Sequence, residues 1–215
     1  MLEEPGAERL VSMDLKKFTE ETAGESPAPG GGSVGAYVGA LGAALGTMVA
    51  NLSAHKRGWD DKWDQYSEWA VIGEKHRNEL LYLVDEDTRA FDRILAAFGL
   101  PKGSDAEKAA RAKAITEATK GAINTPLRTM EVCVESMALM QAMAETGLPA
   151  SVSDAGVGAV CARAGAIAGY LNILINCSGL NDADFKTKVL AKAEALRSEA
   201  EALEADVMRV TLSKM

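Results

Sequence analysis

The strongest candidate for a catalytic residue is Asp87, a carboxylate expected to face the interior of a helical bundle. Asp87 falls among apolar residues spaced three and four apart, between Val84 and Phe91, which is the spacing of one helix face. Burial raises the pKa of a carboxyl group unless cations or hydrogen-bond donors compensate, and such a group suits general acid or base catalysis. A slightly rotated helix would instead leave Asp87 at a wet boundary. The same helix phase predicts that Asp85 and Glu86 are solvated.

A second candidate is the loop 26–33, SPAPGGGS, which precedes a long apolar run. Its prolines and glycines exclude regular structure, and Ser33 is a suitable helix N-cap. Backbone amides at a helix N-terminus favour anions, and glycines allow a ligand close to the main chain. The loop lacks the Gly-Lys-Ser or Gly-Lys-Thr ending of a P-loop, and glycines often serve only to turn a chain. The candidate binding residues here are Gly30, Gly31, Gly32 and Ser33.

The cations Lys56 and Arg57 are a third candidate. No charged residue occurs over residues 26–54, so these two side chains are the first cations after a long apolar stretch. They suit the carboxylates of an acidic ligand. The alternative is that they complement the dipole at the C-terminus of the preceding helix.

A fourth candidate is the small and polar face of the helix expected after Ser153. Ser153 and Asp154 begin this helix, and Asn172 and Asn176 lie near its end. The two asparagines are four residues apart and therefore neighbours on one face, where their amides suit a heterocycle. Amides in such positions more commonly cap backbone groups.

The elements that must position these residues are helices. The 215 residues suffice for one domain with a sizeable core, only 5% are aromatic, and no segment alternates with period two. We predict an all-α, single-domain bundle of six or seven helices over 12–215, after a flexible leader over 1–11. Thr125-Pro126 is expected to restart the chain, with Thr125 as N-cap. The expected helices span 13–22, 34–52, 60–98, 105–123, 126–147, 153–176 and from 182 onward.

Residues 34–52 are the central Gly/Ala-rich helix of this prediction. Their length permits a membrane span, and their glycine spacing fits helix packing in membranes. They form the only such segment recognised in the sequence, and most of them are Gly and Ala. A buried helix with close neighbours is therefore the favoured interpretation, with no membrane partner.

Composition narrows the classes of function. The chain has 23 basic and 31 acidic residues, a net charge of −8, which disfavours nucleic acid and anionic membranes as partners. Three widely spaced cysteines and two histidines give no recognisable zinc spacing, so we expect no metal. The odd cysteine count and the absence of a secretory signal favour a cytoplasmic location.

Motifs in the same order from about residue 13 to 210 resemble the formiminotransferase-cyclodeaminase C-terminal family. That family includes formiminotetrahydrofolate cyclodeaminases and stand-alone methenyltetrahydrofolate cyclohydrolases. Asp87 matches the first residue of the family's Asp-x-x-Ala-Phe motif, and Asp85 lies in the same segment. The matching segments are 26–33, 51–53, 84–91, 100–102, 107–108, 126–127, 153–157 and 172–176.

The resemblance implies an all-helical homodimer that binds a tetrahydrofolate derivative, with no other cofactor and no metal. It implies a cyclohydrolase or a cyclodeaminase, and the lack of a preceding formiminotransferase domain slightly favours the cyclohydrolase. Helix phase makes Asp87 the expected proton-transferring group, with Asp85 the alternative. One departure stands out, because His55 replaces the glycine that the family usually has before its two cations. This departure motivates the alternative of a non-catalytic folate-binding or scaffold protein with the same fold.

Overall fold

The computed structural model describes residues 9–215, and every regular element in that range is helical. Six α-helices and three single 3-10 turns account for these elements, which confirms the predicted all-α class. The α-helices are α1 (Leu15–Ala23), α2 (Gly31–Ala54), α3 (Trp63–Phe98), α4 (Asp105–Thr146), α5 (Val152–Ser178) and α6 (Ala183–Ser213).

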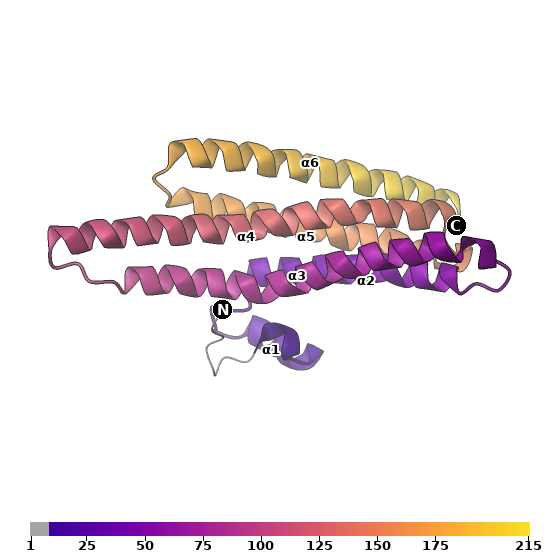
Figure 1. The fold of residues 1–215 in the computed structure, drawn as a ribbon, viewed down its shortest axis with the longest axis horizontal. Coiled ribbons are helices and arrows are strands. Elements are labelled where there is room, and N and C mark those ends of the chain that lie inside the picture. Colours follow the sequence, from indigo (N-terminus) through magenta and orange to yellow (C-terminus); the bar gives the residue numbers. More distant parts are fainter. Residues whose placement is uncertain (1–8) are drawn as a thin grey trace.

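Four long helices, α2 to α5, form the core of the bundle. Helix α2 packs against α3 and α5, and α4 packs against the same two helices from the other side. Helix α6 covers α4 and α5, while α1 lies beside the N-terminal end of α2 (Figure 1). At one end of the bundle α3 and α4 project beyond the other helices as a long hairpin (Figure 1).

Glycines bring α2 and α5 into close antiparallel contact. A Cβ atom added to Gly35 would lie 2.5 Å from Cβ of Ala168, and one added to Gly42 would lie 2.7 Å from the carbonyl oxygen of Gly158. Larger residues at these positions would therefore force the helices apart. The pairs also show that the N-terminus of α2 meets the C-terminus of α5.

Within the described residues 9–215, two helices and not one are long and apolar enough to cross a membrane. They are Gly31–Ala54 and Pro149–Ser178, and packing within the chain buries 61% and 39% of their most apolar stretches. The expectation that residues 34–52 are the only such segment was therefore wrong. Helix α5 also qualifies because Asp154 and Arg163 are its only charged residues.

The predicted break at Thr125-Pro126 is absent, because α4 runs without interruption through Pro126. Thr125 is thus not an N-cap, and its hydroxyl donates to the carbonyl of Gly121 within the helix (3.2 Å). Pro126 has no N–H for the carbonyl of Ala122, four residues earlier. The side-chain amide of Asn176 on α5 donates to that carbonyl instead, at 2.9 Å. This substitute donor lets the helix continue.

Asn176→Ala is expected to destabilise the protein by about 1–3 kcal/mol, the cost of a buried carbonyl left without a donor. Urea denaturation measures the change, and exposed Asn124→Ala is the control. In a Pro126→Ala background the new N–H can bond to Ala122, so the loss should shrink. An equal loss in both backgrounds would show that Asn176 acts in another way.

The N-terminal segment is packed on the bundle from the first described residue onward. Of the leader predicted over residues 1–11, residues 1–8 lie outside the described range. Residues Leu10–Ser12 form a 3-10 turn, and Leu10 is buried in the core. Phe18 on α1 packs against Tyr37 on α2, with ring centroids 5.3 Å apart. The segment thereby covers part of α3, which matters for Asp85.

Candidate functional site

The candidate site is built where Asp87 on α3 meets the first turn of α2. The hydroxyl of Ser33 donates to Oδ2 of Asp87 at 2.9 Å. Ser33 was expected to be the N-cap, but α2 begins earlier, and Gly30 is the cap. Ser33 therefore lies in the first turn, where backbone N–H groups have no partner within the helix. Its side chain is free to reach the carboxylate.

Gly32 permits the close approach of these two elements. A Cβ atom built on Gly32 would lie 2.1 Å from Oδ1 and 2.5 Å from Cγ of Asp87. Any side chain at this position would displace the carboxylate. Glycine at 32 is thus required by the position of Asp87 and not only by the turn that precedes α2.

Burial raises the pKa of Asp87 above its ordinary value. Hydrogen bonds from the side chain and backbone of Ser33 act in the opposite direction, because they stabilise the ionised carboxylate. No cation is paired with Asp87 among the described residues. The group thus combines a raised pKa with donors that fix its orientation, which suits transfer of a proton to or from a bound ligand.

Asp85 is buried, which contradicts the prediction that it is solvated. Its side chain is 5% exposed, forms an ion pair with Arg9 (Nε to Oδ2, 3.0 Å) and accepts the backbone N–H of Val11 (3.3 Å). Helix periodicity marks only the side of α3 that faces the bundle, whereas the N-terminal segment covers the adjacent side. The carboxylate of Asp85 is therefore occupied by structural partners.

Two other details of the α3 prediction were also wrong. Glu86 is not fully solvated, because its side chain is 18% exposed and pairs with Arg89 and Arg93. Phe91 is exposed, so it does not belong to the buried face of α3, which continues past Asp87 through Ala90 and Ala97. Asp87 thus lies within this face.

Asn172 on α5 joins the same cluster. A Cβ atom on Gly31 would lie 3.4 Å from Nδ2 of Asn172, and this amide donates to the carbonyl of Ala168 at 2.8 Å. Asn176 is one turn further along and is held by Ala122, as described above. The structure therefore brings together Gly30–Ser33, Asp87 and Asn172 from three helices.

The other predicted binding residues lie at the opposite end of the bundle. Lys56 and Arg57 follow the C-terminus of α2, about 30 Å from Ser33 at 1.5 Å per residue. Ser153 and Asp154 begin α5 at that same end, since the nearby N–H of Leu148 donates to the hydroxyl of Ser53 (2.8 Å). Within one chain these residues do not share a site with Asp87.

His55, the departure from the family motif, is the C-cap of α2. Its Nδ1 lies 2.9 Å from the carbonyl oxygen of Asn51 in the last turn. The ring therefore folds back on its own helix, while Lys56 and Arg57 remain exposed.

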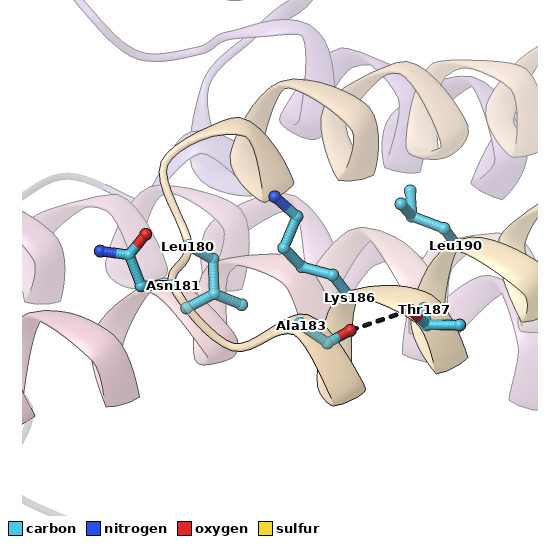
Figure 2. A pocket seen from close by; sticks show the side chains of 6 residues that line it. All are labelled: Leu180, Asn181, Ala183, Lys186, Thr187 and Leu190. Carbon is cyan, nitrogen blue, oxygen red and sulfur yellow. Dashed lines mark hydrogen bonds between the residues drawn. The ribbon is translucent and has the colours of Figure 1, made fainter.

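Sequence reasoning gave no role to Lys186, which lines a shallow hollow at the turn between α5 and α6 (Figure 2). The hollow follows the C-terminus of α5, so it lies at the same end of the bundle as Asn172. Leu180 and Leu190 supply its apolar lining, and Asn181 and Thr187 add polar groups. Lys186 lies in the first turn of α6, and a single cation at the start of a helix does not indicate a hollow, which is why the sequence did not reveal it.

Within residues 9–215, no three side chains of His, Cys, Asp or Glu gather in a way that could hold a metal ion. Burial raises the pKa of the Cys133 thiol to about 12, so this cysteine is not a ready nucleophile. The groups available for chemistry at the site are therefore a carboxylate, a hydroxyl, an amide and backbone N–H groups.

The fold and site define an all-α bundle in which a glycine-rich helix N-terminus meets a half-buried carboxylate. The sequence matches the formiminotransferase-cyclodeaminase family over residues 14–195, and the chain belongs to this family.

Its relatives fall into two groups by length. The methenyltetrahydrofolate cyclohydrolase of Methylorubrum extorquens is 38% identical and is matched over 94% of this chain and 97% of its own length. The formimidoyltransferase-cyclodeaminase of Gallus gallus is 36% identical over 89% of this chain, which spans about a third (35%) of that longer protein.

A solved structure shares the fold. The crystal structure of formiminotetrahydrofolate cyclodeaminase from Thermotoga maritima superimposes with a TM-score of 0.82 and 28% identity. The match covers 94% of this chain and 97% of that one.

Proposed function

We propose that this protein is a one-carbon folate enzyme that hydrolyses 5,10-methenyltetrahydrofolate to 10-formyltetrahydrofolate. The observation that carries the proposal is Asp87, a half-buried carboxylate of raised pKa held against the first turn of α2 by Ser33. The near full-length similarity to a methenyltetrahydrofolate cyclohydrolase supports the same reaction.

The reaction needs a proton moved at one carbon between two nitrogens. Water adds to the cationic methenyl carbon while Asp87 accepts one of its protons. Asp87 then gives this proton to N5 as the bond from that carbon to N5 breaks. The hydroxyl of the adduct releases its proton to solvent, and the formyl group stays on N10. The negative carboxylate also stabilises the positive amidinium-like centre. Asn172 and the free N–H groups of the first turn of α2 are placed to orient the pterin.

Cyclodeamination is the second candidate, favoured by the full-length structural match to a formiminotetrahydrofolate cyclodeaminase. In this reaction N10 attacks the N5-formimino carbon and ammonia leaves, so Asp87 would again move a proton at the same carbon. The geometry of the site serves both reactions.

The absorbance of methenyltetrahydrofolate separates the two reactions with purified protein. Accelerated loss of this chromophore supports the cyclohydrolase, whereas its formation from formiminotetrahydrofolate with release of ammonia supports the cyclodeaminase. If neither rate changes, calorimetry with a folate analogue tests the alternative of a non-catalytic binder. No binding would leave only a scaffold.

Ser33→Ala is expected to move the pH dependence of kcat/KM to higher pH. The ionised form of Asp87 acts as the base, so activity rises as pH passes upward through the pKa of this group. Removing the Ser33 hydroxyl removes a donor that lowers this pKa. Rate measurements across pH test the shift, and an unchanged profile would contradict the role of the hydrogen bond.

We also propose that the protein is a homodimer. Helix α2 presents exposed or half-exposed apolar residues at steps of four and three, the α2 seam: Val34, Val38, Leu41, Leu45, Met48 and Leu52. Helix α5 presents a similar α5 seam: Val157, Val160, Ala164, Ile167, Leu171 and Leu174. In each helix, the seam residues lie one position before the residues that contact the other helix, as Val34 precedes Gly35 and Val157 precedes Gly158. Because the helices are antiparallel, both seams face the same side.

A contiguous apolar face of this kind marks an interaction site, and we propose that a second copy of the chain covers it. Sedimentation at micromolar concentration is expected to show a dimer, and a monomer would contradict it. If extraction instead requires detergent, the face contacts lipid. We further propose a cytoplasmic location for the protein. Its small-molecule partners are then tetrahydrofolate derivatives alone, with no metal or further cofactor.

A further inference from the structure

Helices α2 and α3 pack antiparallel, in a register that leads directly to the candidate site. A Cβ atom added to Gly39 on α2 would lie 3.4 Å from Cδ2 of Leu80 on α3. Seven residues further along α3, Asp87 meets Gly32, which lies seven residues earlier on α2. The row of α3 residues that contains Leu80 therefore faces α2 up to the level of Asp87.

The continuation of this α3 row beyond Asp87 is not covered by α2. Steps of four and then seven residues lead from Asp87 to Phe91 and Phe98, which lie on the same side of the helix. Helix α2 begins only at Gly31, and α3 projects beyond this level together with α4 (Figure 1). Phe91 is accordingly 41% exposed and Phe98 52% exposed, whereas Leu80 in the covered part of the row is fully buried. An aromatic face thus continues α3 outward from the carboxylate of Asp87.

The surroundings of Asp87 therefore have a polar side and an aromatic side. Helix α2 packs between α3 and α5, so the backbone N–H groups of its first turn and the amide of Asn172 on α5 form the polar side with the carboxylate. Phe91 and then Phe98 form the aromatic side. Side chains on a helix lean towards its N-terminus, so the ring of Phe91 lies over the turn that carries Asp87. The two sides meet within one helical turn, about 6 Å.

A folate derivative has a matching division of chemistry. Its pterin carries nitrogen and oxygen atoms that need hydrogen-bond partners, whereas its p-aminobenzoyl ring has only C–H groups along its two long edges. This ring is bonded to N10, which borders the reacting carbon, so the ring must lie next to that carbon. With the pterin on the polar side and the one-carbon unit at Asp87, Phe91 is the nearest aromatic surface for the p-aminobenzoyl ring.

We infer that Phe91 is a substrate-binding residue whose ring stacks on the p-aminobenzoyl ring of the folate, and that Phe98 extends this apolar surface outward. This inference rests on the proposed function and adds the residue that holds N10 and its one-carbon unit beside Asp87. Offset stacking of two aromatic rings is favourable beyond the burial of their apolar area. An aromatic residue at position 91 therefore binds the ring better than an aliphatic residue of similar size.

Phe91→Ala is expected to weaken binding of 5-formyltetrahydrofolate, measured by calorimetry, by about tenfold, because an aromatic contact to a flat ring is lost. Phe91→Tyr keeps the ring and should bind as tightly as the wild type. In the turnover assay Phe91→Ala should raise KM with little change in kcat, since the contact is made before as well as during the reaction. Tyr82→Ala removes a 46% exposed aromatic residue from another side of α3 and is the matched control, with unchanged affinity. Unchanged affinity of Phe91→Ala would overturn the inference.

Nuclear Overhauser effects between protein and ligand protons decide which ring lies on Phe91, independently of catalysis. The chain has only four phenylalanines, so deuterated protein with protonated phenylalanine rings gives few signals. Effects are expected between Phe91 and the p-aminobenzoyl protons of bound 5-formyltetrahydrofolate, and they should vanish in Phe91→Leu. Effects to the pterin protons alone, or none from Phe91, would overturn the inference.

Failure of the Phe91 contact is distinct from failure of the proposed reaction. A wild type that binds 5-formyltetrahydrofolate but does not turn over methenyltetrahydrofolate contradicts the reaction alone, because the Overhauser effects do not depend on turnover. An active wild type with unchanged affinity in Phe91→Ala contradicts the contact alone. If Phe91→Ala changes the sedimentation of the protein and not its affinity, a second copy covers the aromatic face, which also overturns the inference. A wild type that binds no folate overturns both.

Discussion

Asp87→Asn is expected to lower turnover of the folate substrate by about 10²- to 10⁴-fold, the usual contribution of a general acid or base. Asparagine keeps the shape of aspartate and its ability to accept the Ser33 hydrogen bond, but it does not titrate. Binding of a folate analogue, measured by calorimetry, should therefore persist. A variant that lost binding and turnover together would point to a structural role.

The same substitution is expected to stabilise the protein at neutral pH. Because burial raises the pKa of Asp87 in the folded state, its contribution to stability is fully present below the unfolded pKa. That contribution is lost as pH rises through the folded pKa. Asp87→Asn removes this loss, so its denaturation midpoint should exceed that of the wild type at pH 7. A lower midpoint at neutral pH would contradict the desolvation argument.

Asp85→Asn is the matched control, two residues earlier on the same helix. It weakens the contacts with Arg9 and Val11 that hold the N-terminal segment. We expect lower stability and a much smaller change in turnover than for Asp87→Asn. The comparison separates a carboxylate that moves protons from one that anchors the chain.

Gly32→Ala has the second largest expected effect, a loss of turnover of about 10²-fold, which is typical when a catalytic group is displaced by roughly 1 Å. The added Cβ would lie 2.1 Å from Oδ1 of Asp87, so the carboxylate must rotate away from Ser33. Steady-state rates measure the loss, and circular dichroism checks that the helices remain.

Gly121→Ala on α4 is the control for adding a methyl group to a helical glycine. Nothing lies within 4 Å of the added Cβ, and alanine favours helix by about 1 kcal/mol over glycine. Turnover should stay at the wild-type level. If Gly32→Ala were equally active, the carboxylate would not need its observed position.

The sequence predicted the helical class because period and composition are local signals. Three- and four-residue spacing located α3 and α6, and the small residues of α2 indicated a closely packed helix. The break at Pro126 was predicted wrongly because the donor that replaces its missing N–H, Asn176, lies 50 residues later. No local pattern reveals such a partner.

The site was predictable in part. Asp87 was chosen from helix phase, and Gly32 and Ser33 from the loop, but their mutual contact is long-range. The burial of Asp85 was missed because its partners, Arg9 and Val11, lie in a segment taken for a leader. Lys56 and Arg57 were predicted as binding residues from their charge alone, although the helix predicted over residues 34–52 already places them about 30 Å from Ser33.

The role of Asp87 is decided by the loss of methenyltetrahydrofolate absorbance, followed side by side for wild type, Asp85→Asn and Asp87→Asn at equal concentration. We expect accelerated loss with the wild type, a similar rate with Asp85→Asn and a rate lower by about 10²- to 10⁴-fold with Asp87→Asn. If Asp85→Asn abolishes turnover and Asp87→Asn leaves it intact, the assignment of the proton-transferring group to Asp87 is wrong.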